Sequence, residues 1–234
     1  VVVGMIALTV GDFPIPLPEV AATLVGQGSP EHTFIIGNLR APRVAIGLLV
    51  GAAFGVSGAL FQSVTRNPLG SPDFLGFTTG AATGGIVAVI LGGSTWIVAG
   101  SALLGSLATA VLVYGLAFRR GVQSYRLVLV GIGVGAMLLS VNSYLLTRAN
   151  IWEAASAAAW LTGSLSGRGW PQVLPVAVVL VLLLPVWARL TRPLRMLELG
   201  DDTARAMGVP VERTRLAAVI VGVVLCGVAT ASAG

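Results

Sequence analysis

Long uncharged stretches of apolar residues dominate the chain, and short segments between them carry nearly all of its charged residues. Four of these stretches contain 22, 45, 21 and 20 residues, at positions 44–65, 74–118, 127–147 and 169–188. A helix needs about 20 apolar residues to cross the hydrocarbon core of a bilayer. The pattern therefore predicts an all-α, polytopic transmembrane protein, with membrane-crossing helices at residues 44–64, 74–91, 96–118, 127–147, 172–188 and 216–234.

The segments between these helices differ in length and in their helix-breaking residues. Residues 1–11 are apolar but too short to cross a membrane, and we interpret them as the end of a first helix. The connection 12–43 is rich in proline, which should prevent any long helix there. Its prolines are Pro14, Pro16, Pro18 and Pro30. Residues 154–165 form an apolar run of about 12 residues, which favours a re-entrant or interfacial segment over a full crossing.

Prolines and charges mark the last third of the chain as well. Pro175 and Pro185 should kink or break the helix predicted at 172–188, and Pro193 should end it. The segment 189–215 is then the one long charged loop. Within it, two aspartates and a following Gly and Pro predict a short amphipathic helix at 202–207.

Composition supports a membrane protein and excludes several other classes. Hydrophobic residues make up 56% of the chain and charged residues only 10%, whereas soluble domains carry about 25% charged residues. Cys226 is the only cysteine, so no disulfide can form within the chain. A soluble enzyme, a disordered segment and a secreted disulfide scaffold are therefore excluded.

The net charge of +5 comes from 14 arginines, which stand one to three at a time at the ends of apolar runs. Proteins that bind nucleic acid gather basic residues on one solvated face, so we expect no nucleic-acid partner. If the loops alternate sides, Arg66, the loop 119–126 and the loop 189–215 put ten arginines on one side. The positive-inside rule makes that side cytoplasmic and places the connection 12–43 outside.

Glycines recur at a spacing of four residues in three of the predicted helices. At this spacing they share one helix face, where another backbone can approach closely. We therefore predict that they pack helices together and do not bind a ligand. The glycines are Gly47, Gly51 and Gly55, then Gly76, Gly80 and Gly84, and finally Gly131 and Gly135.

Two other classes of function, an intramembrane serine protease and an ion-coupled secondary carrier, fit the residues less well. Ser57 has the small neighbours of an intramembrane serine protease nucleophile, but the only histidine, His32, lies in the external connection. A hydrogen bond of Ser57 to its own or a neighbouring helix is the simpler interpretation. No charged residue lies inside a predicted transmembrane helix, which weakens the case for an ion-coupled secondary carrier.

Two blocks of the sequence resemble a known family of permeases. The first is NLRAPRVAIGLLVGAAFGVSGALFQSVTRNPLGSPDFLGFTTGAATG at 38–84, and the second is MLELGDDTARAMGVPVERTR with the apolar run ending ATASAG at 196–234. They resemble the FecCD-type, cobalamin-permease-like permease subunits of ABC importers for iron–siderophore complexes, haem and cobalamin. Members have about ten helices, so the resemblance implies that 1–234 is one incomplete transmembrane permease domain, cut at both ends, with roughly six to seven helices.

The resemblance also implies partners and sites in a bacterial inner membrane. The permease would form a homodimer or heterodimer with a second permease, between cytoplasmic ATPase subunits and an external substrate-binding protein. Arg40 and Arg43 would accept acidic residues of the binding protein, and Thr79 and Ser124 would lie near a gate. The cytoplasmic coupling loop 189–215 would meet the ATPase through Glu198, Leu199, Gly200, Asp201, Asp202, Ala204, Arg205 and Gly208.

The function implied by this resemblance is uptake of an iron–siderophore or a similar metal chelate. The chain would have no catalytic residue and would bind no cofactor or metal, because ATP and magnesium are used by the partner ATPase. The sequence does not distinguish a siderophore from haem or cobalamin. An ATP-independent secondary carrier or channel is the alternative.

Overall fold

The computed structural model describes residues 2–11, 13–118 and 124–234, and every regular element in these residues is a helix. This confirms the all-α prediction. Arg119 and Arg120, which the arginine count includes, lie outside the described residues. The elements are α1 (Val2–Thr9), α2 (Leu17–Leu24), α3 (Pro30–Phe34), the π-helical η1 (Ile35–Arg40), α4 (Ala41–Thr65), α5 (Phe77–Ile90), α6 (Thr95–Ala117), α7 (Ser124–Arg148), α8 (Ile151–Thr162), α9 (Trp170–Glu198), α10 (Asp201–Ala206) and α11 (Val211–Ala233).

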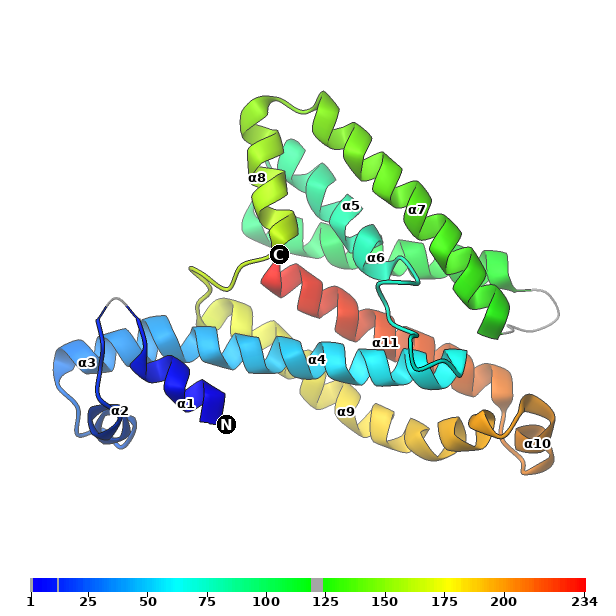
Figure 1. Ribbon diagram of the computed structural model, residues 1–234, viewed down its shortest axis with the longest axis horizontal. Coiled ribbons are helices and arrows are strands. Elements are labelled where there is room, and N and C mark those ends of the chain that lie inside the picture. Colours follow the sequence, from blue (N-terminus) through cyan, green and yellow to red (C-terminus); the bar gives the residue numbers. More distant parts are fainter. Residues whose placement is uncertain (1, 12, 119–123) are drawn as a thin grey trace.

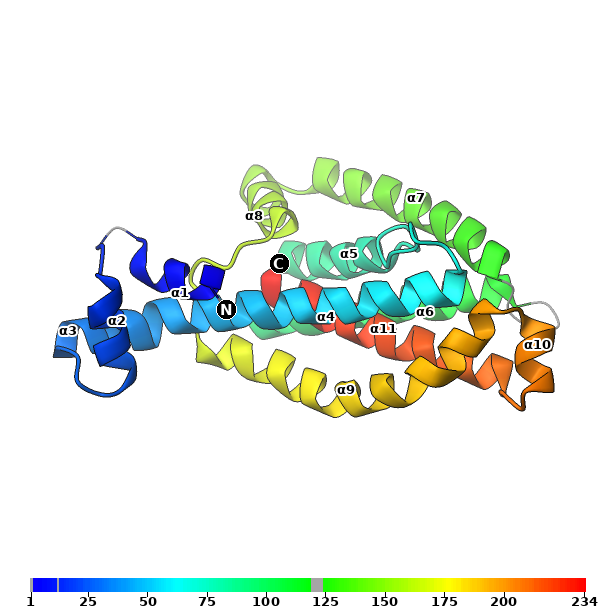
Figure 2. The same cartoon turned by 60° about the horizontal axis from the view of Figure 1, so that its bottom comes forward.

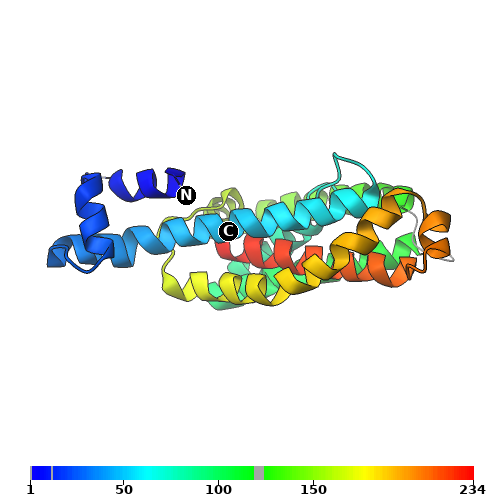
Figure 3. The same ribbon diagram turned by 90° about the horizontal axis from the view of Figure 1, so that it is seen from below.

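Five helices of the described chain are long and apolar enough to cross a membrane. They are the continuous helix Pro30–Thr65, which combines α3, η1 and α4, together with α6, α7, α9 and α11. Helices α4, α6, α9 and α11 run alongside one another (Figures 1 and 2). The short helices α2 and α3 lie at one end of this bundle, whereas α10 lies at the opposite end (Figure 3).

The proline-rich connection 12–43 does contain the start of a long helix, contrary to the prediction. Pro30 occupies the first turn of α3, where its missing N–H costs no hydrogen bond. Ser29 caps this turn by accepting a hydrogen bond from the backbone N–H of His32 at 3.2 Å. The π-helical turn η1 then precedes Pro42. Its wider hydrogen-bonding pattern lets the helix continue although Pro42 has no backbone N–H to donate. A proline at a helix start therefore begins a helix here and does not interrupt it.

Helix α5 is shorter than the crossing predicted at 74–91. It has 14 residues, about 21 Å, against the roughly 30 Å of the hydrocarbon core. Gly76 before it adopts a left-handed conformation with φ of 78°, and the backbone N–H of Phe77 bonds to the carbonyl of Pro72 at 3.1 Å. The turns that precede α5 bring its first residue beside the middle of α7, since Gly76 packs on Gly135. The helix therefore begins inside the bundle and not at its end (Figure 1).

Helix α9 continues through three prolines that were expected to kink, break or end it. It spans 29 residues and contains Pro175, Pro185 and Pro193. Each proline removes one backbone hydrogen bond and bends a helix without necessarily ending it. Helix α9 packs against α4 and α11 and has buried residues on both sides of Pro185, which holds the helix together. It is visibly bowed in Figure 2. The predicted loop 189–215 is therefore helical at both ends, and only residues 199–210, around α10, connect α9 to α11.

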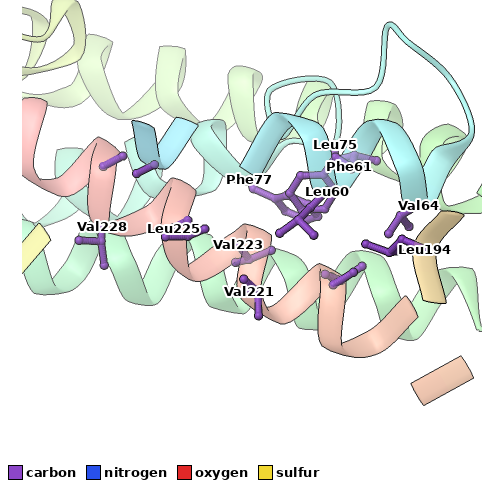
Figure 4. Packing of buried hydrophobic residues seen from close by; sticks show 14 of the residues in the cluster. Leu60, Phe61, Val64, Leu75, Phe77, Leu194, Val221, Val223, Leu225 and Val228 are labelled. Carbon is purple, nitrogen blue, oxygen red and sulfur yellow. The ribbon is translucent and has the colours of Figure 1, made fainter. Parts of the chain in front are cut away.

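Helix α11 is the most enclosed of the five long helices. Of the residues in its apolar 18-residue stretch 56% are buried, against 17% for the corresponding stretch of α9. Its side chains meet those of α4 and of the segment before α5 in the apolar cluster of Figure 4. The rings of Phe61 and Phe77 lie 5.2 Å apart there. Gly222 makes room for them, because a Cβ at this position would lie 2.7 Å from the Phe61 ring. A larger side chain at Gly222 would therefore push α11 away from α4.

Candidate functional site

Helix α10 is a six-residue helix held between the ends of α9 and α11. The helix predicted at 202–207 is thus confirmed to within one residue. Gly200, at φ of 114°, and Gly208, at φ of 83°, supply left-handed turns on either side of it. The Leu199 and Met207 side chains, 65% and 49% exposed, flank the helix. Within the helix, Ala204 is fully buried, so α10 presents an apolar face to the bundle and its other faces to solvent.

Asp201 joins α10 to two other helices through ion pairs. Its carboxylate pairs with the guanidinium of Arg66, which ends α4 in a left-handed conformation with φ of 52°. The same carboxylate lies 3.1 Å from Nη2 of Arg215, whose side chain is 2% exposed at the start of α11. Nearby, the Ser63 hydroxyl donates a hydrogen bond to the Glu198 carboxylate at 3.3 Å. The ends of α4, α9, α10 and α11 therefore form one connected unit.

The charges around Asp201 favour its ionised form. Burial raises the pKa of Asp201, but the charges of Arg215 and Arg66 and the hydrogen bonds that they donate lower this pKa by more than burial raises it. The net pKa lies below the ordinary aspartate value. At neutral pH the carboxylate is thus a permanent anion between two guanidinium groups.

The structure divides the eight predicted coupling residues into an outward and an inward set. The outward set is exposed: Glu198, Leu199, Asp202, Arg205 and Gly208. The inward set is partly or fully buried: Gly200, Asp201 and Ala204. Among the outward residues, Asp202 and Arg205 form an ion pair of 3.0 Å with each other.

Sequence reasoning counted Arg66 and Arg215 only as topology signals and missed their contacts with Asp201. A signal for Arg215 is present in the sequence, since it shares a helical face with Ala218 and Gly222, three and seven residues further on. Both of these residues are buried, and so is Arg215. Arg213 lies on another face of the same helix and is exposed.

Arg40 and Arg43 lie at the opposite end of the bundle. The Arg40 guanidinium donates a hydrogen bond to the Leu8 carbonyl at 2.7 Å and another to the Phe13 carbonyl. It therefore fastens the end of α1 and the following turn to the long helix. Arg43 is exposed, and both arginines line a cavity of about 880 Å³ beside α1.

Thr79 and Ser124, the predicted gate residues, are not brought together. The Ser124 hydroxyl donates to the Val64 carbonyl at 2.7 Å, at the same end of the bundle as α10. Thr79 lines a cavity of about 470 Å³ and accepts a long hydrogen bond of 3.5 Å from the Asn142 amide through its carbonyl. Asn142 lies 18 residues beyond Ser124 on α7, about 27 Å along the helix axis. Asn142 is 6% exposed and was missed by the sequence reasoning.

The spaced glycines have unequal surroundings. A Cβ at Gly84 would collide with the backbone carbonyl of Ser101 on α6, and one at Gly80 with Thr109 on the same helix. Gly76, Gly131 and Gly135 lie where the segment before α5 crosses α7. A Cβ at Gly47 would lie 3.3 Å from Leu165. At Gly51 and Gly55, no described atom beyond the adjacent residues and nearby backbone of the same helix lies within 4 Å of where a Cβ would stand.

Ser57 bonds across to a neighbouring helix. Its hydroxyl donates to the Gly222 carbonyl at 2.7 Å and thereby links α4 to α11 inside the core. His32 lies in α3, where its ring Nδ1 is 3.2 Å from the Glu19 carboxylate. The serine and the histidine of the protease hypothesis thus occupy different regions and have other partners.

Comparison with known proteins gives consistent matches over the whole chain. The FecCD transport family matches residues 1–234. The chain is 46% identical over 235 residues to the ferric enterobactin transport system permease protein FepG of Escherichia coli (strain K12), covering all of this chain and 71% of that protein. It is 36% identical over 233 residues to the achromobactin transport system permease protein CbrC of Dickeya dadantii (strain 3937), covering 97% and 66%.

A solved structure matches the fold over the same length. It is described as an inward-facing conformation of a metal-chelate type ABC transporter. The TM-score is 0.87 at 27% sequence identity, and the match covers all of this chain and 72% of the other. The overall helical arrangement of the chain thus has a counterpart in a solved structure.

Proposed function

The chain belongs to the FecCD transport family and is a membrane permease of the ABC-importer type, and we propose that its cargo is a ferric siderophore. The observation that carries the proposal is the 46% identity, along the whole chain, to a ferric enterobactin permease. The similarity to an achromobactin permease supports the same class of cargo. The five helices of the described chain that are long and apolar enough to cross a membrane agree with a permease.

The partners proposed are those of an ATP-driven importer in the bacterial inner membrane. A second permease subunit would complete the pathway, and a substrate-binding protein would deliver the chelate from outside. Cytoplasmic ATPase subunits would bind ATP and magnesium, so this chain performs no hydrolysis. In this arrangement α10 would face the ATPase together with the exposed side chains that flank it, Leu199 and Met207.

The ion pairs of Asp201 suggest how α10 transmits motion. An ATPase that pushes on α10 would move α9 and α11 through the backbone. The Arg66–Asp201 pair adds α4, which lies far away in sequence, to the same moving unit. Two helices that pack against each other, α4 and α11, are thereby displaced together, and their mutual packing is kept.

Uptake by the reconstituted transporter tests this function. We expect proteoliposomes that hold the permease and its ATPase to accumulate iron-55 delivered as a ferric siderophore by the binding protein, only when ATP is enclosed. A non-hydrolysable ATP analogue should abolish accumulation, and a protonophore should leave it unchanged. Uptake that persists without ATP hydrolysis and collapses with the protonophore would instead support the secondary carrier. Faster uptake of haem or cobalamin than of the siderophore would contradict the proposed cargo.

Reversing the charge of Arg43 should weaken docking of the binding protein. Arg43 is the better test of the two arginines because Arg40 also holds the carbonyls of Leu8 and Phe13. Loss of one charge contact predicts roughly tenfold weaker binding of the binding protein to Arg43→Glu, with a larger difference at low ionic strength. The measurement is a titration of immobilised transporter at two salt concentrations.

The matched control is Arg148→Glu, an exposed arginine at the end of α7. It should bind like the wild type. Equal affinities of the Arg43 variant and the wild type would reduce Arg43 to a membrane anchor.

A further inference from the structure

Three arginines on α9 form a basic stripe, which comprises Arg189, Arg192 and Arg195. All three are exposed, and within the described part of the chain no hydrogen bond or ion pair engages them. By contrast, Arg66, Arg205 and Arg215, at the same end of the molecule, each pair with a carboxylate. The basic stripe is thus a concentration of charge that the fold does not use internally.

The basic stripe continues the outward-facing apolar row of α9. Leu174, Val178 and Val181 form this row, and their side chains are 66%, 47% and 68% exposed. At about 100° per residue, Arg192 falls on the centre of the same row, with Arg189 and Arg195 about 60° to either side. Helix α9 is the least enclosed of the long helices in the described part of the chain, and an exposed apolar row of this kind suits contact with lipid chains.

The length of α9 places the basic stripe at the membrane surface. Arg189 follows the first residue of the helix, Trp170, by 19 positions, about 28 Å. Tryptophan favours the membrane interface, and with Trp170 at the outer boundary this rise spans the roughly 30 Å hydrocarbon core and puts Arg189 at the inner boundary. Arg192 and Arg195 then extend about 5 and 9 Å further, into the headgroup layer.

We propose that the basic stripe binds the phosphate groups of anionic phospholipids in the cytoplasmic leaflet. A guanidinium group presents paired N–H donors that match phosphate oxygens, and anionic lipids are concentrated in this leaflet. The apolar row above the basic stripe accepts the acyl chains of the same lipids. A function in topology alone requires basic residues anywhere in the loop, whereas these three lie on or beside the exposed apolar row.

The bound lipid would steady the segment that leads into α10. Only Leu199 and Gly200 separate the end of α9 from the start of α10. If the chain is the ATP-driven permease proposed above, this position predicts an effect of lipid on coupling. The lipid composition of the cytoplasmic leaflet should change the efficiency with which ATP hydrolysis drives uptake. Lipid binding itself does not depend on the transported cargo.

Native mass spectrometry of the purified transporter complex tests the proposal with phosphatidylglycerol and phosphatidylcholine as probes. The wild type should bind phosphatidylglycerol preferentially, and the variant R189Q/R192Q/R195Q should bind it at least about tenfold more weakly. Orientation should be kept, since seven of the ten arginines assigned to the cytoplasmic side remain. The lysine variant R189K/R192K/R195K should retain binding within about threefold, because it keeps the charge.

Controls separate this proposal from its alternatives. The variant R205Q/R213Q, which removes exposed cytoplasmic arginines outside the basic stripe, should bind phosphatidylglycerol like the wild type. Equal binding by the glutamine variant and the wild type would overturn the proposal, as would equal losses in the glutamine and lysine variants. Unchanged lipid binding with release of the ATPase would assign the basic stripe to a protein contact and would also overturn it. None of these measurements of lipid binding depends on cargo uptake. A failure of the proposed function would appear only in the uptake assay and can be told apart from a failure of this proposal.

Discussion

Asp201→Asn should uncouple ATP hydrolysis from uptake while the chain still inserts into the membrane. Asparagine keeps the size of the side chain but removes the charge that holds Arg66 and Arg215. The nearly buried Arg215 would lose its 3.1 Å ion pair with Asp201, while the Glu212 carboxylate stays 3.8 Å from its guanidinium. We expect a loss of roughly 2–3 kcal/mol in the stability of this end of the bundle. Motion of α10 would then reach α4 only through the packing of α9 and α11 and the Ser63–Glu198 hydrogen bond, and so less directly.

The measurement is the ratio of ferric siderophore imported to ATP hydrolysed, together with the melting temperature in detergent. Asp73→Asn is the control, because this aspartate is exposed, lies outside the coupling loop 189–215, and forms no ion pair within the described part of the chain. This control should change neither quantity measurably. Asp201→Glu, which keeps the charge, should recover part of the coupling. A wild-type transport ratio in Asp201→Asn would show that the ion pairs do not transmit the motion.

The pH dependence of stability provides a separate check on Asp201. Because its folded-state pKa lies below the ordinary aspartate value, its contribution is complete above the unfolded-state pKa. The contribution is lost as the pH falls through the folded-state pKa. The melting temperatures of wild type and Asp201→Asn should therefore differ at neutral pH and converge in acid. A difference that grows on acidification would contradict this assignment.

Gly84→Val should prevent α5 and α6 from packing and thereby lower the yield of folded protein severely. The new side chain would collide with the backbone carbonyl of Ser101, which cannot rotate away as a side chain could. Separating two helix backbones costs about 3 kcal/mol or more, a large part of the stability of a typical protein. The measurement is the fraction of solubilised chain that elutes as a single species, with its melting temperature.

Gly51→Val is the matched control for this substitution. Gly51 belongs to the same spaced set of glycines, but no described atom of another helix lies within 4 Å of the position its Cβ would take. Its yield should stay close to that of the wild type. If both variants lost folded protein equally, the close approach of α5 and α6 would not be the cause.

The long helices and α10 could be predicted from the sequence because their signals are local. An apolar run of about 20 residues is favoured in a bilayer largely by its own composition. Gly200, Gly208 and the two aspartates between them set the ends of α10 through the conformations of neighbouring residues. These local free energies change little with the rest of the fold.

Helix interruptions were predicted less well, for a physical reason. A proline removes one hydrogen bond, but the helix ends only if nothing else holds its two halves. Helix α9 continues past Pro185 because α4 and α11 pack along it. Helix α5, in contrast, starts only at Phe77, because Gly76 turns there and packs on Gly135. Neither set of contacts can be predicted from the residues adjacent in sequence, because both are made by helices that are distant in the chain.

The sequence by itself determined that this chain is helical, spans a membrane and carries a short helix before its last long one, because burial in lipid and helix capping depend on adjacent residues. Only the tertiary structure decided that the Asp201 carboxylate turns inward to Arg66 and Arg215 and that Arg40 holds the carbonyl of Leu8. Arg66 and Asp201 are 135 residues apart in the chain. The energy of a charge pair depends on the distance between the charges in space, which folding alone sets.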